Sequence, residues 1–193
     1  DPHLRTGPHS ATLPQLLDHI RTSVEIDLLT TLAHDAPILV RDGDLTSLHP
    51  TLKERVTTLT TTHTVIGLAK TNTAITTAGA GAASVLLPHA PTGPWRYDAT
   101  LVDGLTFGFT KLHPASKHIF LVETNNTTSL SSLLPTANDP SFLGYPYPLI
   151  LADKLARISA VEQSHWKAKA LVRFPELANH LTATDAHERL DNL

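Results

Sequence analysis

The sequence predicts an α/β fold, in which a mixed β-sheet has helices packed on it. Three observations lead to this prediction. A run with helical periodicity opens the chain, short apolar runs closed by turn residues follow it, and a second helical run lies near the carboxyl end. The order helix, strands, hairpin, strand, helix is typical of a layered domain in which helices cover a sheet.

The first helix is predicted from Leu13 to about Leu32. Its apolar residues recur at the spacing of a stripe that faces a core, namely Leu13, Leu17, Ile20, Val24 and Leu28. Glu25 falls at the edge of this stripe. Taken alone, the pattern favours an ordinary solvated role for Glu25.

Two buried strands are predicted next. The run "ILVRDG" is apolar and β-branched and ends at Asp42-Gly43, and the run "TVIGLAK" covers residues 64 to 70. Asp42 therefore stands at the carboxyl end of a strand. Taken alone, Asp-Gly after a strand favours a turn.

The middle of the chain predicts a loop, a hairpin and one more strand. A Gly/Ala/Pro-rich stretch, "TAGAGAASVLLPHAPTGP", indicates a loop with one short element. Asp103-Gly104 lies between alternating residues, which is a strong hairpin signal. The run "HIFLVET" supplies the further strand, and a polar stretch separates it from the last helix.

The last helix is predicted from about Pro148 to Ala170, after the segment "GYPYPLILADKLARIS". Stepping residues by 100° places Asp153 on a face made mostly of alanine, which would let the helix lie close to a sheet. A carboxylate there must be covered, paired or used. The helix pattern alone favours a carboxylate that interacts with the helix dipole, a contribution of roughly 0.3–1 kcal/mol.

Composition limits the class of protein. The chain has 193 residues, 41% of them hydrophobic and 17% charged, which is typical of one globular domain. No apolar run is long enough to cross a bilayer, so we expect no membrane association. The net charge of −3 argues against binding to DNA by bulk positive potential, so any nucleic-acid contact is expected to be local.

Missing residue types exclude some chemistry. Cysteine is absent, which excludes disulfides, thiolate zinc sites and cysteine nucleophiles. Methionine is absent even at position 1, so we expect this chain to begin downstream of its initiator. The opening residues have no targeting pattern, and a cytoplasmic location is expected.

Other motifs are weak. "GAGAAS" lacks the third glycine of a dinucleotide fingerprint, the histidines are scattered, and no nucleophile elbow or P-loop is present. Basic residues on or after the last helix indicate either a basic strip or a solvated face; they are Lys154, Arg157, Lys167, Lys169 and Arg173.

Taken together, the helix with Glu25, "ILVRDGDL", "VIGLAKT" and "GYPYPLILADKLARIS" resemble the NurA family of DNA-end-processing nucleases. The resemblance spans about residues 20 to 162. It implies an RNase H-like core that gathers acidic residues around divalent metal, typically Mn²⁺, with Mg²⁺ as the alternative. It also implies cleavage of DNA from 5′ ends and within single strands, during end resection at double-strand breaks. The implied partners are a HerA-type hexameric translocase and a second copy of the chain.

The resemblance assigns four site residues. Glu25, Asp42 and Asp153 correspond to metal ligands, and Tyr145 corresponds to the motif tyrosine. Some members have histidine where this chain has Asp153, and a carboxylate is an equally suitable ligand for Mn²⁺ or Mg²⁺. Two such ions would bind the scissile phosphate from both sides. Lys70, Lys154 and Arg157 are the candidate contacts to DNA phosphates.

The beginning of the chain departs from the family. The family's first ligand is an aspartate in a DGS-like motif on a strand before the glutamate helix, and residues 1 to 24 contain no such strand. We therefore expect a single nuclease domain over residues 1–193 that is incomplete at its N-terminus. The alternative is a catalytically inactive module of the same fold that binds a translocase or dimerises.

Overall fold

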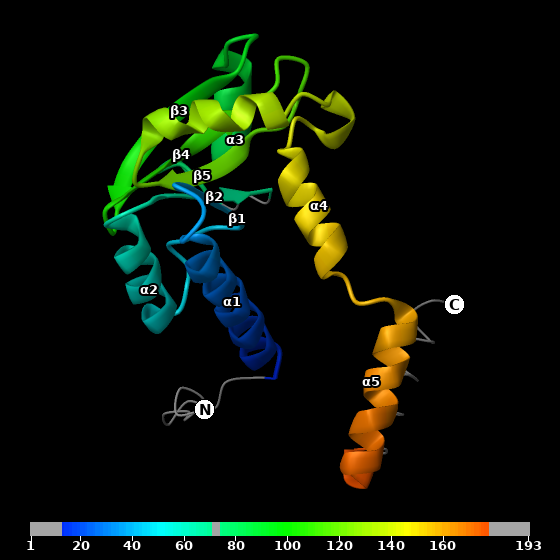
Figure 1. Ribbon diagram of the computed structural model, residues 1–193. Helices are drawn as coiled ribbons and strands as arrows, with labels where there is room; N and C mark the ends of the chain where they lie inside the picture. Colours follow the sequence, from blue (N-terminus) through cyan, green and yellow to red (C-terminus); the bar gives the residue numbers. More distant parts are fainter. Residues whose placement is uncertain (1–12, 71–73, 178–193) are drawn as a thin grey trace. The chain divides into compact units, whose positions relative to one another are not determined.

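The computed structural model describes residues 13–70 and 74–177. Within them the chain forms one five-stranded sheet and several helices (Figure 1). The strands are β1 (Ile38–Asp42), β2 (Thr64–Ala69), β3 (Trp95–Val102), β4 (Leu105–Lys111) and β5 (Phe120–Thr124). The α-helices are α1 (Leu13–Leu32), α2 (Pro50–Thr60), α3 (Ala82–Leu86), α4 (Tyr147–Ala156) and α5 (Ala160–Arg173), and the longest 3₁₀ segment is η3 (Thr127–Thr136).

The sheet is mixed, as predicted, and has the order β1-β2-β5-β4-β3. Strands β1 and β2 are parallel, and the other neighbours are antiparallel. Asp103 and Gly104 join β3 to β4 with φ values of 52° and 78°, which is the geometry expected of an Asp-Gly hairpin turn. This arrangement is consistent with an RNase H-like α/β fold.

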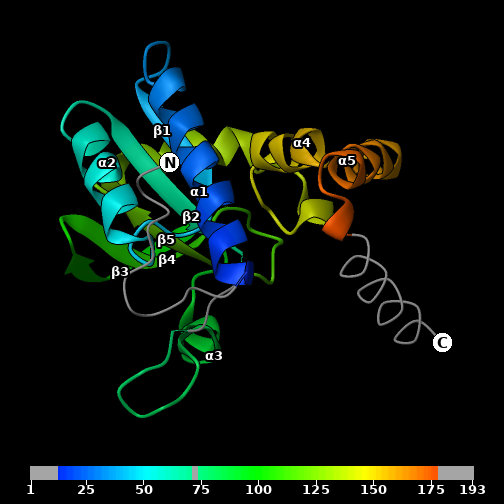
Figure 2. The same cartoon turned by 90° about the horizontal axis from the view of Figure 1, so that it is seen from below.

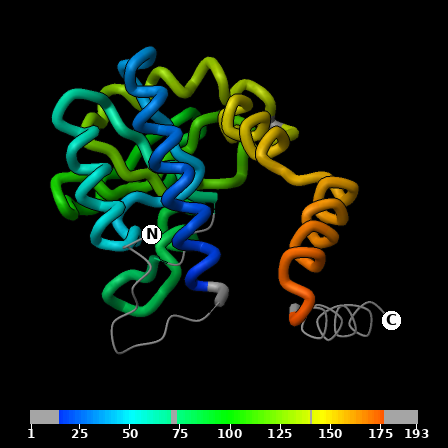
Figure 3. The backbone as a smooth tube through the Cα atoms, turned by 60° about the horizontal axis from the view of Figure 1, so that its bottom comes forward, coloured from blue at the N-terminus to red at the C-terminus, as the bar shows by residue number. Residues whose placement is uncertain are grey.

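Helices α1 and α2 lie together on one side of the sheet (Figures 1 and 3). Their shared core includes Ile26, Leu29, Leu39, Val56 and Val65. A second core contains the other side chains of β2 and β5 together with η3 and the start of α4, including Leu68, Phe120, Val122, Leu130, Tyr145 and Leu149. The alternation of side chains along each strand explains these two cores. The short helix α3 lies in a loop that projects from the sheet (Figure 2).

Helix α1 corrects one expectation. The predicted core stripe is exposed, with Leu17 57%, Val24 61% and Leu28 58% accessible, whereas Ile26 and Leu29 are buried. Leu13 lies in the helix, but its side chain is outside the described set. The helix has apolar residues on two sides, and the periodicity alone does not say which side meets the sheet.

Two helices also differ from the expectation. Helix α2 was not predicted, because its threonine-rich sequence has low apolar content; Leu52, Val56 and Leu59 nevertheless bury one face.

The predicted helix from Pro148 to Ala170 is two helices, α4 and α5. Ser159 begins the second with a capping box, in which its hydroxyl accepts a hydrogen bond from the Glu162 amide and the Glu162 carboxylate accepts one from the Ser159 amide.

The chain divides into two compact units, Asp1–Ile150 and Leu151–Leu193. The first contains the sheet, and the second contains α5 and most of α4. Several large apolar side chains of the second unit are exposed, among them Leu155, Val161, Trp166 and Val172. A single domain over residues 1–193 stays a prediction.

Candidate functional site at the end of strand β1

Asp42 ends strand β1 and is paired at both carboxylate oxygens. The Tyr145 hydroxyl lies 2.8 Å from Asp42 Oδ1, and the Lys70 ammonium donates to Oδ2 at 2.7 Å. The Tyr145 hydroxyl also lies 2.9 Å from the carbonyl oxygen of Leu68, so its single proton is shared between two acceptors. Three of the residues singled out from the sequence, Asp42, Tyr145 and Lys70, are therefore brought together.

The GYPYPL segment holds Tyr145 in place. Gly144 adopts a left-handed φ of 71°, and an added Cβ would lie 2.6 Å from the Cβ of His113, so a side chain is excluded twice over. Tyr145 is buried, and its ring packs edge-on against Phe120 at 5.1 Å. Pro146 is also fully buried and leads directly into α4. Burial and close packing of this segment therefore hold the Tyr145 hydroxyl at the end of β1.

Lys70 comes directly after β2, the strand parallel to β1. Parallel strands end at the same edge of a sheet, which explains why Lys70 and Asp42 meet. The Lys70 ammonium also lies over the Tyr145 ring, 4.7 Å from its centroid. The side chains of Lys70 and Asp42 are 47% and 35% accessible. This is a half-exposed ion pair at the carboxyl edge of the sheet.

Glu25, on α1, contacts the same strand β1 through an ion pair with Arg41 and not at Asp42. The Arg41 guanidinium donates to Glu25 Oε2 through Nη2 at 2.8 Å and Nε at 3.1 Å, and Arg21 donates to Oε1 at 2.5 Å. Arg41 is only 7% accessible. Because Arg41 and Asp42 are consecutive in a strand, their side chains point to opposite faces. Glu25 and Asp42 are thus held by different cations on the two faces of β1.

Arg21 is paired with Asp18 as well as with Glu25. Its hydrogen bond to Asp18 is the main cause that raises the pKa of the Arg21 guanidinium above its ordinary value; burial opposes this rise, and the charge of Glu25 adds to it. The group therefore keeps its charge throughout the physiological range. Glu25 stays between two permanent cations.

The loop after Asp42 is fixed by a residue that the sequence did not single out. Glu123, at the end of β5, is 1% accessible. Its carboxylate accepts hydrogen bonds from the Leu45 amide, from the Thr46 amide at 2.9 Å and from the Thr46 hydroxyl at 2.5 Å. Its signal in the sequence was a lone charged residue within an otherwise buried strand. Glu123 stabilises the turn that carries Asp42.

Gly67 allows that turn to lie close over β2. An added Cβ would be 2.7 Å from Leu45 Cγ and 2.8 Å from the carbonyl oxygen of Gly43. The Gly43 amide donates to the Leu68 carbonyl at 2.9 Å. The Arg41 guanidinium donates to the Asp44 carbonyl from the other side. The backbone around Asp42 is consequently tethered at several points.

The remaining predicted residues lie in the second unit. The Asp153 carboxylate accepts a hydrogen bond from Arg157 Nη2 at 2.7 Å, an i,i+4 pair in which Arg157 is 74% accessible. Lys154 is exposed in the last turn of α4. Within the first unit, the candidate site consists of Asp42, Tyr145 and Lys70, with Glu25 on the opposite face of β1.

The donor chemistry at Asp42 suits a hard divalent cation. Mg²⁺ and similar ions bind through one or two carboxylates and complete their shells with water and phosphate oxygens. The Lys70 ammonium already acts as a cation at Oδ2. Across residues 13–70 and 74–177, no group of three or more histidine, aspartate or glutamate side chains could hold a metal ion. Within this part of the chain, the site at Asp42 would offer such an ion a single carboxylate.

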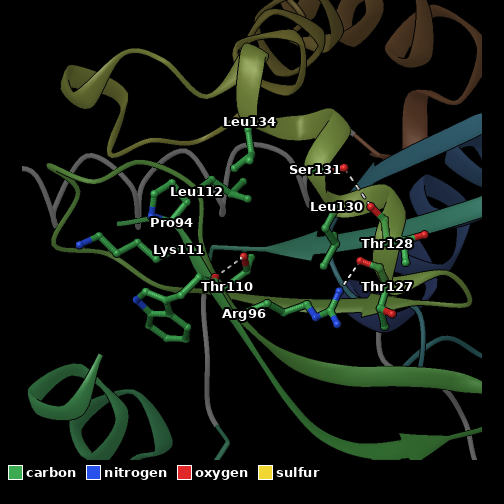
Figure 4. Close-up of a pocket in the computed structure, with 11 residues that line it drawn as sticks. Pro94, Arg96, Thr110, Lys111, Leu112, Thr127, Thr128, Leu130, Ser131 and Leu134 are labelled. Carbon is green, nitrogen blue, oxygen red and sulfur yellow. Dashed lines mark hydrogen bonds between the residues drawn. The ribbon is translucent and has the colours of Figure 1, made fainter. Parts of the chain in front are cut away.

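A separate pocket of about 230 Å³ lies on the sheet beside η3 (Figure 4). Its lining contains none of the predicted site residues. Several of its polar side chains are hydrogen-bonded within the protein, whereas the buried indole nitrogen of Trp95 has no partner in the part of the chain that the structure describes. Arg96 binds Asp98 and the Thr127 carbonyl, while Ser131 donates to the Thr128 carbonyl at 3.0 Å. The candidate chemistry therefore lies at Asp42 rather than in the pocket.

None of the helices that the structure describes has the length and apolar character needed to span a membrane. Neither the curated proteins nor the solved structures contain a match to this chain. The family comparison does give one: residues 15–158 match the NurA domain. The matched region includes Glu25, Asp42, Lys70, Tyr145 and Asp153. Because the match covers most of the chain, this protein belongs to the NurA family, a nuclease family with a role in DNA end processing.

Proposed function

We propose that this chain is a divalent-metal-dependent deoxyribonuclease that cuts DNA from 5′ ends and within single strands, in the resection of double-strand breaks. One observation carries the proposal beyond family membership. The hydroxyl of Tyr145 is 2.8 Å from the carboxylate of Asp42, although the two motifs are far apart in the sequence. A buried tyrosine that orients a half-exposed carboxylate is typical of a prepared functional site.

Asp42 is the proposed ligand that the geometry supports best, and Glu25 and Asp153 are proposed as further carboxylate ligands of Mn²⁺ or Mg²⁺. A bound divalent ion would neutralise charge on the scissile phosphate. Each carboxylate would first have to exchange a cationic partner: Lys70 at Asp42, Arg41 at Glu25 and Arg157 at Asp153. Lys70 and Arg157 are accessible, whereas Arg41 is buried.

Tyr145 has a positioning role in this proposal. Its ring is fixed by burial and by contact with Phe120, so its hydroxyl can direct Asp42 without moving. The hydrogen bond from this hydroxyl holds the Asp42 carboxylate in one orientation, with Oδ2 left for a cation. Lys70, Lys154 and Arg157 are proposed to contact DNA phosphates, so binding should weaken as salt rises.

We further propose that the chain works as a homodimer in the cytoplasm with a HerA-type hexameric ATPase that translocates DNA. Family membership is the support for these partners. The exposed apolar residues of α1, among them Leu17, Val24 and Leu28, are available for contact with another chain.

The decisive experiment measures Mn²⁺-dependent cleavage of an end-labelled single-stranded DNA by the wild-type chain and by Asp42→Ala. We expect Asp42→Ala to reduce cleavage at least about 100-fold, because it removes the carboxylate around which the site is built. Asp27→Ala is the matched control, since Asp27 is an exposed carboxylate on α1 paired with Arg55. Equal cleavage by wild type and Asp42→Ala would disprove a role of Asp42.

The second candidate is a catalytically inactive module that binds a translocase or dimerises. It is favoured by the pairing of each candidate carboxylate with a basic side chain in the structure. Absence of cleavage by the wild-type chain, together with retained binding to a HerA-type hexamer, would support this function instead.

A further inference from the structure

The half-exposed pair between Lys70 and Asp42 differs from the other contacts of this aspartate. Tyr145, at Oδ1, is a neutral donor that burial holds in place, with 4% of its surface accessible. Lys70, at Oδ2, is a charged donor on a flexible side chain that is 47% accessible. Of the two partners, Lys70 is therefore the one that can leave without disturbing the core.

A cation arriving at Asp42 would compete with the Lys70 ammonium. Both carry positive charge, and the Lys70 ammonium occupies Oδ2, an oxygen that such a cation would also use. Exposed ion pairs of this kind are weak, so exchange is energetically accessible. The Arg41–Glu25 pair offers a contrast, because a guanidinium that is only 7% accessible cannot be released into solvent as easily.

We propose that Lys70 is the resident counter-ion of Asp42, that a hydrated divalent cation displaces it, and that the released ammonium then binds a DNA phosphate beside the site. The proposal rests on the function proposed above. No covalent bond changes in this exchange. The carboxylate stays neutralised before and after, and the positive charge of Lys70 becomes available to the substrate only when the cation is bound.

This arrangement gives Lys70 two opposite effects. It lowers the affinity of Asp42 for a divalent cation, because it competes for Oδ2. It raises the affinity of the cation-loaded chain for DNA, because it adds a phosphate contact. A lysine that only bound DNA would show the second effect alone, and a lysine that only stabilised the fold would show neither.

The test measures Mn²⁺ binding directly, by electron paramagnetic resonance of free Mn²⁺, in wild type, Lys70→Met and Asp42→Asn. We expect Lys70→Met to tighten Mn²⁺ binding about two- to fivefold, the range of an exposed ion pair. We expect Asp42→Asn to abolish it. Lys53→Met is the matched control, since Lys53 pairs with Asp103 at 3.1 Å in a similarly exposed setting, and it should leave Mn²⁺ binding unchanged.

A second measurement separates the two effects. Fluorescence anisotropy with single-stranded DNA, in the presence of saturating Ca²⁺ to limit cleavage, should show weaker binding by Lys70→Met, about two- to fivefold. Lys70→Arg should recover much of this affinity because it keeps the charge. Thermal unfolding without divalent ions checks that each variant is folded.

The outcomes distinguish this proposal from the proposed function. Unchanged Mn²⁺ binding in Asp42→Asn, or no binding by any variant, would remove the metal site at Asp42 and the exchange with it. Loss of binding in Asp42→Asn with no tightening in Lys70→Met would keep the metal site and overturn the exchange. Weaker Mn²⁺ binding in Lys70→Met would overturn it as well.

Discussion

Two carboxylates flank strand β1, and their cationic partners differ in burial. Glu25 is held by the buried Arg41, and Asp42 is held by the half-exposed Lys70. Both are ion pairs of ordinary length, yet a buried guanidinium is costly to leave unpaired whereas an exposed ammonium is readily solvated. The comparison teaches that the burial of the cation decides how firmly a carboxylate is tied into the structure and how readily its partner is released for exchange.

Replacing Arg41 is the strongest way to test the structural half of this comparison. We expect Arg41→Met to lower the free energy of unfolding by about 3 kcal/mol, because it breaks a buried ion pair and frees the Asp44 carbonyl. Urea unfolding followed by circular dichroism gives the value. Lys70→Met is the matched control and should cost less than about 1 kcal/mol. Equal losses in both variants would contradict the comparison.

Glu123 provides a second structural test, at a carboxylate that has no cation partner among the contacts described here. We expect Glu123→Ala to lower the free energy of unfolding by about 2 kcal/mol, since the amides of Leu45 and Thr46 lose their acceptor. Glu123→Gln keeps one acceptor oxygen and should lose less. Urea unfolding again measures the change, and an unaltered midpoint in Glu123→Ala would show that the loop is held without this residue.

Tyr145→Phe tests how much the tyrosine hydroxyl contributes to the position of Asp42. The ring remains to pack on Phe120, so only the hydroxyl is removed, and we expect about 1 kcal/mol of lost stability. Cleavage of single-stranded DNA should fall about tenfold, because Asp42 is less well oriented. A variant as active as wild type would show that Asp42 needs no help from the tyrosine.

The smallest effect concerns the capping box of α5. The hydrogen bond from the Ser159 amide, and to a lesser extent the one from its hydroxyl, lowers the pKa of the Glu162 carboxyl. A lowered folded-state pKa means that the contribution is present above the ordinary value of 4.5 and is lost as pH falls through the lower value. Helical circular dichroism should therefore weaken in acid more in wild type than in Glu162→Gln. Identical acid titrations would show that the box does not support the helix.

Much of the fold could be predicted from local patterns. The strands at β1, β2 and β5 were buried apolar runs, and the β3–β4 hairpin followed from the backbone preference of Asp103-Gly104. The break between α4 and α5 also had a local signal, Ser159 with Glu162 three residues later. The sequence analysis did not use that signal, and the apolar residues on both sides of it favour one continuous helix.

The core side of α1 could not be read from the sequence. Leu17, Val24 and Leu28 form a regular stripe, but Ile26 and Leu29 lie on the opposite side and meet the sheet. Periodicity identifies a helix and its apolar residues, whereas the choice of face depends on contacts with distant strands.

The sequence indicated residues of the candidate site but not the contacts between them. Motif resemblance indicated Asp42 and Tyr145, and Lys70 as a phosphate contact, but the Lys70–Asp42 pair depends on two parallel strands ending together. Glu123 was missed because a buried carboxylate has no short motif. Its role becomes evident only when the loop after β1 is placed over β2 and β5.

The hydrogen bonds from Leu45 and Thr46 to Glu123 have a dynamic consequence. They connect the loop beyond β1, at the rim of the sheet, to β5 at its centre. Amide protons exchange with solvent when the cooperative unit that protects them opens. The amides of Leu45 and Thr46 should therefore exchange as slowly as those of β5, and Asp42 would remain in place while other parts of the rim fluctuate.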